Sequence, residues 1–159
     1  MSVVSNAGPL ISLARIGYFK LLHDLFGQVY IPRAVYHEVV VAGQGLPGSQ
    51  EVEEAAGDWI EVRTIREPLM ARGLVSLGRG EAEAIALAIE MKADLILLDD
   101  KKARQVAAYL GLPLSGTLGV LRAAFRKGWI ENWDEVLEAL VAHGFWLGRD
   151  LGSQSSPSE

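Results

Sequence analysis

The chain contains no cysteine, which excludes disulfide bonds, thiolate nucleophiles and zinc sites built on thiolates. It also has no apolar run of about 18 residues or more, so no segment is expected to span a membrane. Residues 1–6 have neither a basic stretch nor a long apolar core, and we therefore expect no signal peptide. Together these absences fit the reducing environment of the cytoplasm, which is the location that we expect.

Positive charge is also scarce in this chain. There are 15 Lys and Arg residues against 20 Asp and Glu residues, giving a formal net charge of −5 and a pI of about 5.2. Proteins that bind nucleic acid through phosphate contacts usually have a basic surface. Part of the negative charge would lie in an acidic site and be offset by a bound metal. The composition therefore argues against tight, autonomous binding of nucleic acid, although it says nothing against the fold.

The remaining composition is that of a globular domain. The 159 residues are 50% apolar and 22% charged, which is enough to build one sizeable core. Apolar strand-like runs alternate with helical patterns, which is typical of βαβ units and a parallel sheet. We therefore expect an α/β fold in a single domain over residues 1–150, followed by a polar, disordered tail at residues 151–159.

Five segments have the pattern of strands, at residues 2–5, 28–31, 59–65, 95–98 and 112–114. The continuous aliphatic run at 95–98 is typical of a central strand buried on both faces. Pro113 suggests that the last strand lies at an edge. The first predicted helix begins at about Pro9 and is interrupted at Gly17. Another begins at Pro32, and further helices are predicted over residues 18–26, 49–56, 67–74, 81–91, 101–110, 118–127 and 134–143.

Asp99 and Asp100 are the strongest signal of a functional site. They directly follow the aliphatic strand at 95–98, and ligands in open parallel sheets bind beyond the carboxyl ends of the strands. Two adjacent carboxylates repel each other unless a cation or basic groups compensate. Either residue is also a good cap for the helix that begins near Lys101. Metal binding by at least one of them is the favoured interpretation, and both roles are compatible within the pair.

Three further oxygen-bearing side chains are placed to join this pair. Asn6 follows the first strand, Glu38 lies in the helix after the second strand, and Glu81 begins the apolar helix at 81–91. Capping or solvent exposure is the alternative for each of them: metal binding is the favoured interpretation for Glu81, exposure is favoured for Glu38, and both roles stay open for Asn6. Glu83, two residues beyond Glu81, either assists or faces solvent. Carboxylate and amide oxygens gathered at one sheet edge would suit Mg²⁺ or Mn²⁺.

Basic and hydroxyl side chains near these acids are candidates for contact with nucleic acid. Lys101 and Arg104 follow the acidic pair, and Thr117 follows the last strand, where it would hold phosphate or water or else cap a helix. Lys102, Arg15, Arg33 and Arg79 are further candidates. Most such side chains are simply solvated, so each is an expectation to be tested by its position in the fold.

The ordered set of motifs resembles the PIN-domain superfamily of nucleases, in particular a branch of small prokaryotic PIN-like proteins. The resemblance covers roughly residues 2–130. It is carried by VVSNAGPLISLA at 3–14, IPRAVYHE at 31–38, GEAEAIALA at 80–88, LLDDKKAR at 97–104 and GTLGVL at 116–121.

This resemblance implies a three-layer α/β/α Rossmann-like fold and Mg²⁺- or Mn²⁺-dependent cleavage of RNA. Many such relatives are toxins neutralised by a small antitoxin protein, and dimers are common among them, so the resemblance suggests an antitoxin partner and a homodimer. Carried over by position, the site comprises Asn6, Glu38, Glu81 and Asp100, with Asp99 beside it.

One residue departs from the family pattern. The first-strand position, usually aspartate in PIN nucleases, is Asn6 here. The loss of a carboxylate weakens a divalent-metal site, because ligand charge strongly affects affinity. Two readings therefore stay open: a nuclease of reduced activity, or a catalytically silent PIN-like module that binds RNA or a partner protein. A third reading, a phosphoacceptor domain centred on the Asp pair, leaves Glu38 and Glu81 unexplained.

Overall fold

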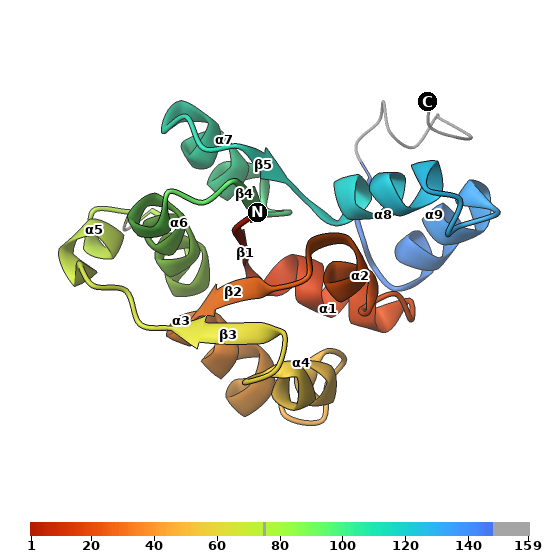
Figure 1. Ribbon diagram of the computed structural model, residues 1–159, viewed down its shortest axis with the longest axis horizontal. Helices are drawn as coiled ribbons and strands as arrows, with labels where there is room; N and C mark the ends of the chain where they lie inside the picture. Colours follow the sequence, from red (N-terminus) through yellow and green to blue (C-terminus); the bar gives the residue numbers. More distant parts are fainter. Residues whose placement is uncertain (75, 148–159) are drawn as a thin grey trace.

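Five parallel strands form one sheet in the computed structural model, which describes residues 1–74 and 76–147. The strand order is β3-β2-β1-β4-β5, and every pairing is parallel (Figure 1). The strands are β1 (Val3–Ser5), β2 (Val29–Pro32), β3 (Ile60–Arg63), β4 (Leu95–Leu97) and β5 (Leu114–Ser115). The predicted α/β class and the parallel sheet are confirmed.

The helices follow the predicted pattern closely. They are α1 (Ala7–Arg15), α2 (Leu21–Phe26), α3 (Arg33–Tyr36), the π-helix η1 (His37–Ala42), α4 (Ser49–Ala55), α5 (Pro68–Arg72), α6 (Arg79–Met91), α7 (Lys101–Tyr109), α8 (Thr117–Arg126) and α9 (Trp133–Ala142). Gly17 and Gly27 have φ values of 81° and 74°, conformations that favour glycine and interrupt or end a helix. The expected tail at 151–159 lies outside the described residues.

The last strand begins two residues later than the sequence predicted. The backbone N–H of Leu112 donates to Ala107 and so completes the end of α7, with Gly111 at a φ of 76°. Pairing with β4 starts only at Pro113, whose carbonyl accepts a hydrogen bond from Ile96. Leu112 therefore belongs to the helix terminus, and Pro113 stands at the entry to an edge strand, where its missing N–H has no consequence.

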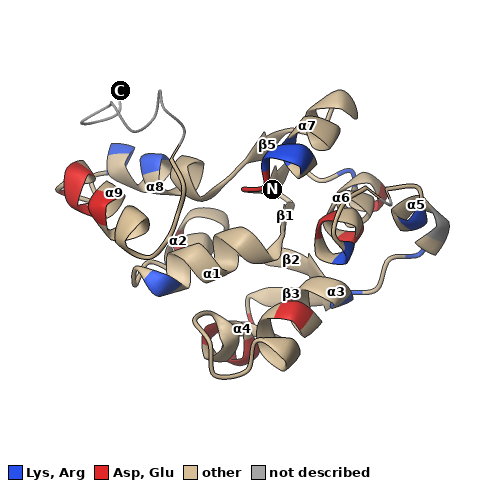
Figure 2. Ribbon diagram, turned by 180° about the vertical axis from the view of Figure 1, so that it is seen from behind, with Lys and Arg blue, Asp and Glu red and all other residues tan. Residues whose placement is uncertain are grey.

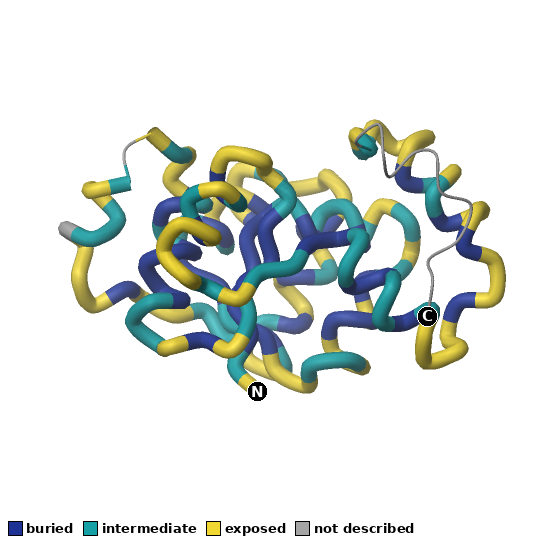
Figure 3. Tube along the Cα trace, turned by 90° about the horizontal axis from the view of Figure 1, so that it is seen from above, coloured by how far each residue is buried: buried dark blue, intermediate teal, exposed yellow. Residues whose placement is uncertain are grey.

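The sheet is covered by helices on both faces, which gives the three layers. Val3 and Leu97 face a core built with α1, α2, α4, α8 and α9, whereas Val4, Ile96 and Leu98 face a second core built with α6 and α7. Neighbouring residues of one strand thus point into different cores, as the two-residue period of a strand requires. The buried part of the chain gathers in the middle of the molecule (Figure 3), and the two sets of helices lie on opposite sides of the sheet (Figure 1).

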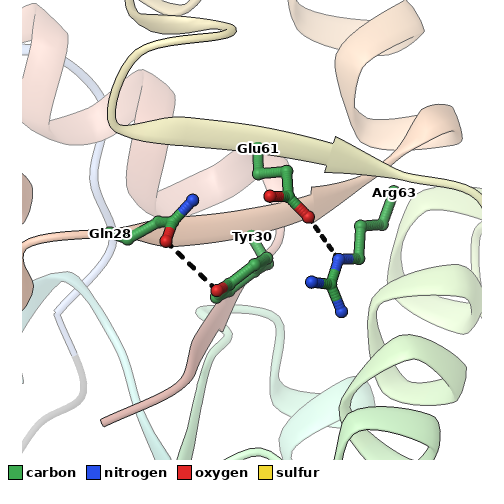
Figure 4. A network of polar contacts seen from close by, with 4 residues as sticks. All are labelled: Gln28, Tyr30, Glu61 and Arg63. Carbon is green, nitrogen blue, oxygen red and sulfur yellow. Dashed lines mark hydrogen bonds and ion pairs between the residues drawn. The ribbon is translucent and has the colours of Figure 1, made fainter.

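The edge strand β3 is protected by polar side chains. Arg63 forms an ion pair with Glu61, and its guanidinium lies 4.7 Å from the centre of the Tyr30 ring on β2. The Tyr30 hydroxyl donates to the Gln28 side chain at 3.2 Å (Figure 4). Charged side chains on an edge strand oppose pairing with the strand of another molecule.

The strand order places the candidate residues at one point of the sheet. Val4 pairs with Ile96 and Ser5 with Leu97, and the backbone N–H of Asn6 donates to the Leu97 carbonyl at 3.0 Å. From β1 the chain continues to β2 on one side, whereas from β4 it continues to β5 on the other. The crevice at such a reversal is where ligands bind in open α/β sheets. None of the helices within residues 1–74 and 76–147 has the length and apolar character needed to cross a bilayer.

Candidate active site

Side chains from two distant elements meet over the start of α6. Asn6 precedes α1 and is 5% exposed, and its Oδ1 has no hydrogen-bond partner among the described residues. A Cβ atom placed on Gly80 would lie 3.3 Å from this oxygen and 2.8 Å from Oε1 of Glu38. Both oxygens therefore point into the space that the missing side chain of Gly80 leaves open. A buried oxygen without a partner is costly, so this space favours a ligand that can bind it.

Glu81 adds a second carboxylate next to this space. It lies in the first turn of α6, and its carboxylate folds back over the start of the helix, where negative charge is favoured. The pKa of Glu38 is raised, first by the loss of solvent around the carboxyl and second by the negative charge of Glu81. The two carboxylates are thus close enough to repel each other, and a cation between them would remove that repulsion.

Glu38 is carried by a π-helix, which the sequence analysis did not foresee. It lies in the first turn of η1, which continues directly from α3. A Cβ on Gly43, the residue after η1, would lie 2.6 Å from the Val39 carbonyl oxygen and 2.9 Å from that of Glu38. The wide turn therefore ends against a residue that must lack a side chain. Single π-turns occur often at functional sites, and the glycine was the one signal of it in the sequence.

Asp99 is held between the starts of two helices. Its Oδ1 accepts a hydrogen bond from the Thr117 backbone N–H at 2.8 Å, and its Oδ2 accepts one from the Thr117 hydroxyl at 2.6 Å. Oδ2 also lies 3.4 Å from the position of a Cβ on Gly8, in the first turn of α1. Burial raises the pKa of the Asp99 carboxyl, and this effect exceeds the lowering by Thr117 and by the Arg104 charge.

Asp100 has a different position from its neighbour. It is exposed, and its Oδ2 accepts a hydrogen bond from the Ala103 backbone N–H at 2.9 Å, which makes it the N-cap of α7. The capping role that the sequence left open is thus the one observed for Asp100. The carried-over site favoured Asp100 over Asp99, but only Asp99 is directed toward the first turn of α1.

Two of the residues predicted to contact nucleic acid make hydrogen bonds within the protein. Thr117 is fully buried, and both its N–H and its hydroxyl donate to Asp99. The Arg104 guanidinium donates to the carbonyls of Leu98 at 2.8 Å and Ser115 at 3.0 Å, and so ties together the chain ends of β4 and β5. Thr117 thus uses both of its donors inside the protein, whereas Arg104 makes both of its hydrogen bonds through Nη1. Lys101 is exposed at the start of α7 and remains available to solvent.

A groove of about 1210 Å³ opens beside Glu38 and Glu81. It lies between α3, η1, β3 and the start of α6, and Arg33, Tyr36 and Arg79 also line it. Arg33 lies on α3 and Glu38 on η1, whereas α6 carries both Arg79 and Glu81, and α3 packs against α6 (Figure 2). The groove therefore offers positive side chains to a phosphate-bearing ligand and negative ones to a cation, within one space.

The oxygen donors fit a hard divalent cation in one specific way. In the described part of the chain, no three His, Asp or Glu side chains lie together in a group that could hold a metal ion. Glu38 and Glu81 with the amide oxygen of Asn6 supply two charged donors and one neutral donor. Mg²⁺ commonly binds through one or two carboxylates and keeps several waters, and the cluster matches that requirement.

A parallel α/β sheet with acidic residues at its topological switch point, where the strand order reverses, defines a class of ligand-binding and catalytic domains. The family model described as "PIN domain" matches residues 2–156, and the chain therefore belongs to the PIN-domain family. PIN domains are generally nucleases. A search of curated proteins returns no match for the chain. The family suggested by the sequence motifs is thus confirmed, and the match extends beyond the residues that carried the resemblance.

Replacement of Gly80 by alanine is expected to separate function from stability. Alanine favours a helix by up to about 1 kcal/mol over glycine, so the free energy of unfolding should not fall. The new Cβ would lie 2.8 Å from Glu38 Oε1, and the flexible carboxylate would move away from Asn6. We expect about 10-fold weaker Mn²⁺ binding by calorimetry, a loss typical of a disturbed ligand environment. Unchanged affinity would show that the space above Gly80 is not the cation site.

Replacement of Asp99 by asparagine is expected to change the pH dependence of stability. The raised pKa of Asp99 means that the folded state prefers the protonated carboxyl. Wild type therefore loses stability relative to the variant as pH rises from about 4, the ordinary range of an aspartate, through the raised pKa. Urea unfolding of both proteins between about pH 4 and pH 8 measures the difference. A difference that stays constant over that range contradicts the prediction.

Proposed function

We propose that this chain is a Mg²⁺- or Mn²⁺-dependent endoribonuclease. The observation that carries the proposal is the unpartnered Oδ1 of Asn6, buried beside Glu38 over Gly80. An acidic pair alone would be unremarkable on a protein surface. A buried neutral oxygen aimed at the same space calls for a partner with positive charge, and a hard cation prefers oxygen donors.

Each of the site residues has a separate role in the proposed reaction. Glu38 and Glu81 would supply the negative charge that holds the ion, and Asn6 a neutral oxygen. A bound divalent ion lowers the pKa of its water and stabilises negative charge on the scissile phosphate. Asp99, kept in place by Thr117, would keep the crevice between β1 and β4 acidic. Because the negative charge of Glu81 raises the pKa of Glu38, the positive ion would favour the ionised form of Glu38.

The groove supports single-stranded RNA as the substrate. Arg33 and Arg79 line it together with the two carboxylates, so phosphates can be bound within reach of the ion. Tyr36 lines the same space and provides an aromatic surface on which a base can stack. The net charge of −5 limits affinity to what these local contacts and the ion supply. We therefore propose weak, metal-assisted binding.

The second candidate function is a PIN module that binds RNA or a protein without cleaving. The amide at Asn6, where PIN nucleases usually have a carboxylate, favours it. Calorimetric titration with Mn²⁺ distinguishes the two: the nuclease binds the ion in wild type, whereas the silent module does so only after Asn6→Asp. For the nuclease we propose the role of the toxin in a toxin–antitoxin pair, and the finding of a neighbouring reading frame for a small DNA-binding antitoxin would support it.

The direct test of the nuclease proposal is cleavage of a labelled single-stranded RNA. Wild-type protein is incubated with the RNA in Mn²⁺, in Mg²⁺ and in EDTA, and products are separated by size. Cutting within the strand that requires the ion is the expected result. The absence of ion-dependent products with substrates of varied sequence and structure would reject nuclease activity.

A further inference from the structure

Glu83 links α6, which carries Glu81, to α3, which continues into the π-helix η1 that carries Glu38. Its Oε1 accepts a hydrogen bond from the Ala34 backbone N–H at 3.2 Å, and its Oε2 accepts one from Arg79 Nε at 3.3 Å. The side chain is only 14% exposed. Of the two readings that the sequence allowed, solvent exposure is thus wrong, and the side chain lies between α6 and α3.

The contact replaces a cap that α3 lacks. The first N–H groups of a helix have no partner within the helix and need an acceptor from elsewhere. The residue before α3 is Pro32, whose side chain has no acceptor atom. Glu83 supplies the missing oxygen from another helix. Because α3 continues into η1, holding Ala34 also holds the start of the segment that carries Glu38, four residues later.

A second contact fixes the same two helices. A Cβ on Gly80 would lie 3.6 Å from a methyl group of Val35, so α3 approaches α6 closely at this glycine. Gly80 and Glu83 are three residues apart and therefore lie on one side of α6. The helix α3 is thus held at two adjacent residues, through the backbone of Ala34 and the side chain of Val35, beside the place where Glu38 meets Asn6.

We propose that Glu83 is a positioning residue that sets the separation of the Glu38 and Glu81 carboxylates and does not bind the ion. Each of its oxygens already accepts a hydrogen bond from the protein. The functional consequence rests on the cation site proposed above, but the positioning itself requires no metal. An amide oxygen can accept the bond from Ala34 as well as a carboxylate oxygen can, so Glu83→Gln keeps the positioning contact while it removes the charge.

Three variants test the proposal. Glu83→Ala removes the contact, Glu83→Gln retains the acceptor, and Asn132→Ala is a matched control that removes a comparable cap. In that control, Oδ1 of Asn132 accepts from the Glu135 backbone N–H at 3.2 Å at the start of α9, far along the chain from the site. A general loss of stability would affect both alanine variants alike, whereas positioning is specific to Glu83.

The first measurement is amide hydrogen exchange in EDTA, which is independent of metal. Glu83→Ala should accelerate exchange in residues 34–42 by about fivefold or more, the factor that corresponds to a lost helix cap. Glu83→Gln should match wild type there, and Asn132→Ala should change only residues 133–142. Unaltered exchange at 34–42 in Glu83→Ala would overturn the proposal.

The second measurement is Mn²⁺ binding by calorimetry. Glu83→Ala should weaken affinity by about 10-fold or more, as the loss of a residue that orients a ligand does, whereas Glu83→Gln and Asn132→Ala should bind as wild type does. If Glu83→Gln were as weak as Glu83→Ala, Glu83 would act through its charge, and the positioning role would be wrong. A wild type that binds no Mn²⁺ rejects the proposed cation site, and the exchange measurement then still decides whether Glu83 positions α3.

Discussion

Glu38→Gln and Glu81→Gln are each expected to lower Mn²⁺-dependent RNA cleavage by at least about 100-fold. The loss of a residue that merely orients a metal ligand costs about 10- to 100-fold, and the loss of a charged ligand should cost no less than the upper end of that range. Glutamine keeps the size of each side chain, so the groove retains its shape. The rate is measured with RNA in excess and at several Mn²⁺ concentrations, because weakened ion binding should be partly overcome by more Mn²⁺.

Two further variants serve as controls for that result. Glu138→Gln makes the same chemical change at an exposed position of α9, away from the groove, and should cleave as wild type does. Asp100→Asn keeps the cap of α7, because asparagine caps a helix about as well as aspartate. We expect it to retain most of the activity. A loss equal to that of Glu81→Gln would instead place Asp100 among the ligands, and full activity in both glutamine variants would defeat the assignment of the site.

The fold was largely predictable because its signals are local. The aliphatic run at β4 is typical of a strand buried on both faces, and the apolar helix α6 is typical of a buried helix. Strands that alternate with helices along the chain favour a parallel sheet. Helix ends at Gly17 and Gly27 follow from backbone conformations that few other residues adopt. The predicted start of β5 was wrong because the N–H of Leu112 completes the end of α7. Strand propensity does not reveal that a residue is needed for the end of the preceding helix.

The candidate site was less predictable, because its details depend on contacts between distant residues. The sequence could name Asp99 and Asp100 but could not say which one turns inward, since neighbours at a strand end point in different directions. Thr117 lies 18 positions from Asp99, and the role of its hydroxyl follows only from the packing of α8 against the sheet. The position of Glu38 depends on a π-helix ending at Gly43, a geometry that helical periodicity does not reveal.

Asn6→Asp is expected to have opposite effects on stability with and without metal. In EDTA the new carboxylate would be buried next to Glu38 and near Glu81, which should raise its pKa, and a buried charge without a partner costs about 2–3 kcal/mol at neutral pH. The start of α1 offsets this by about 0.3–1 kcal/mol, because it favours negative charge. We therefore expect a net loss of about 2 kcal/mol, which disappears below the ordinary pKa of aspartate because the group is then protonated in both states.

With Mn²⁺ present, the third negative charge should strengthen binding by about 10-fold or more, because the charge of the ligands sets the affinity of such sites. Saturating Mn²⁺ should then raise the melting temperature of Asn6→Asp by more than it raises that of wild type, since a ligand stabilises the state that it binds. If RNA cleavage and Mn²⁺ affinity both increase in Asn6→Asp, the wild-type protein is a nuclease whose activity is weakened by the amide of Asn6. If only Asn6→Asp cleaves RNA, the wild-type protein is a catalytically silent module that lacks one carboxylate needed for activity. If neither the stability in EDTA nor the affinity for Mn²⁺ changes, Oδ1 of Asn6 does not face a cation site, and the proposed metal-dependent mechanism is wrong.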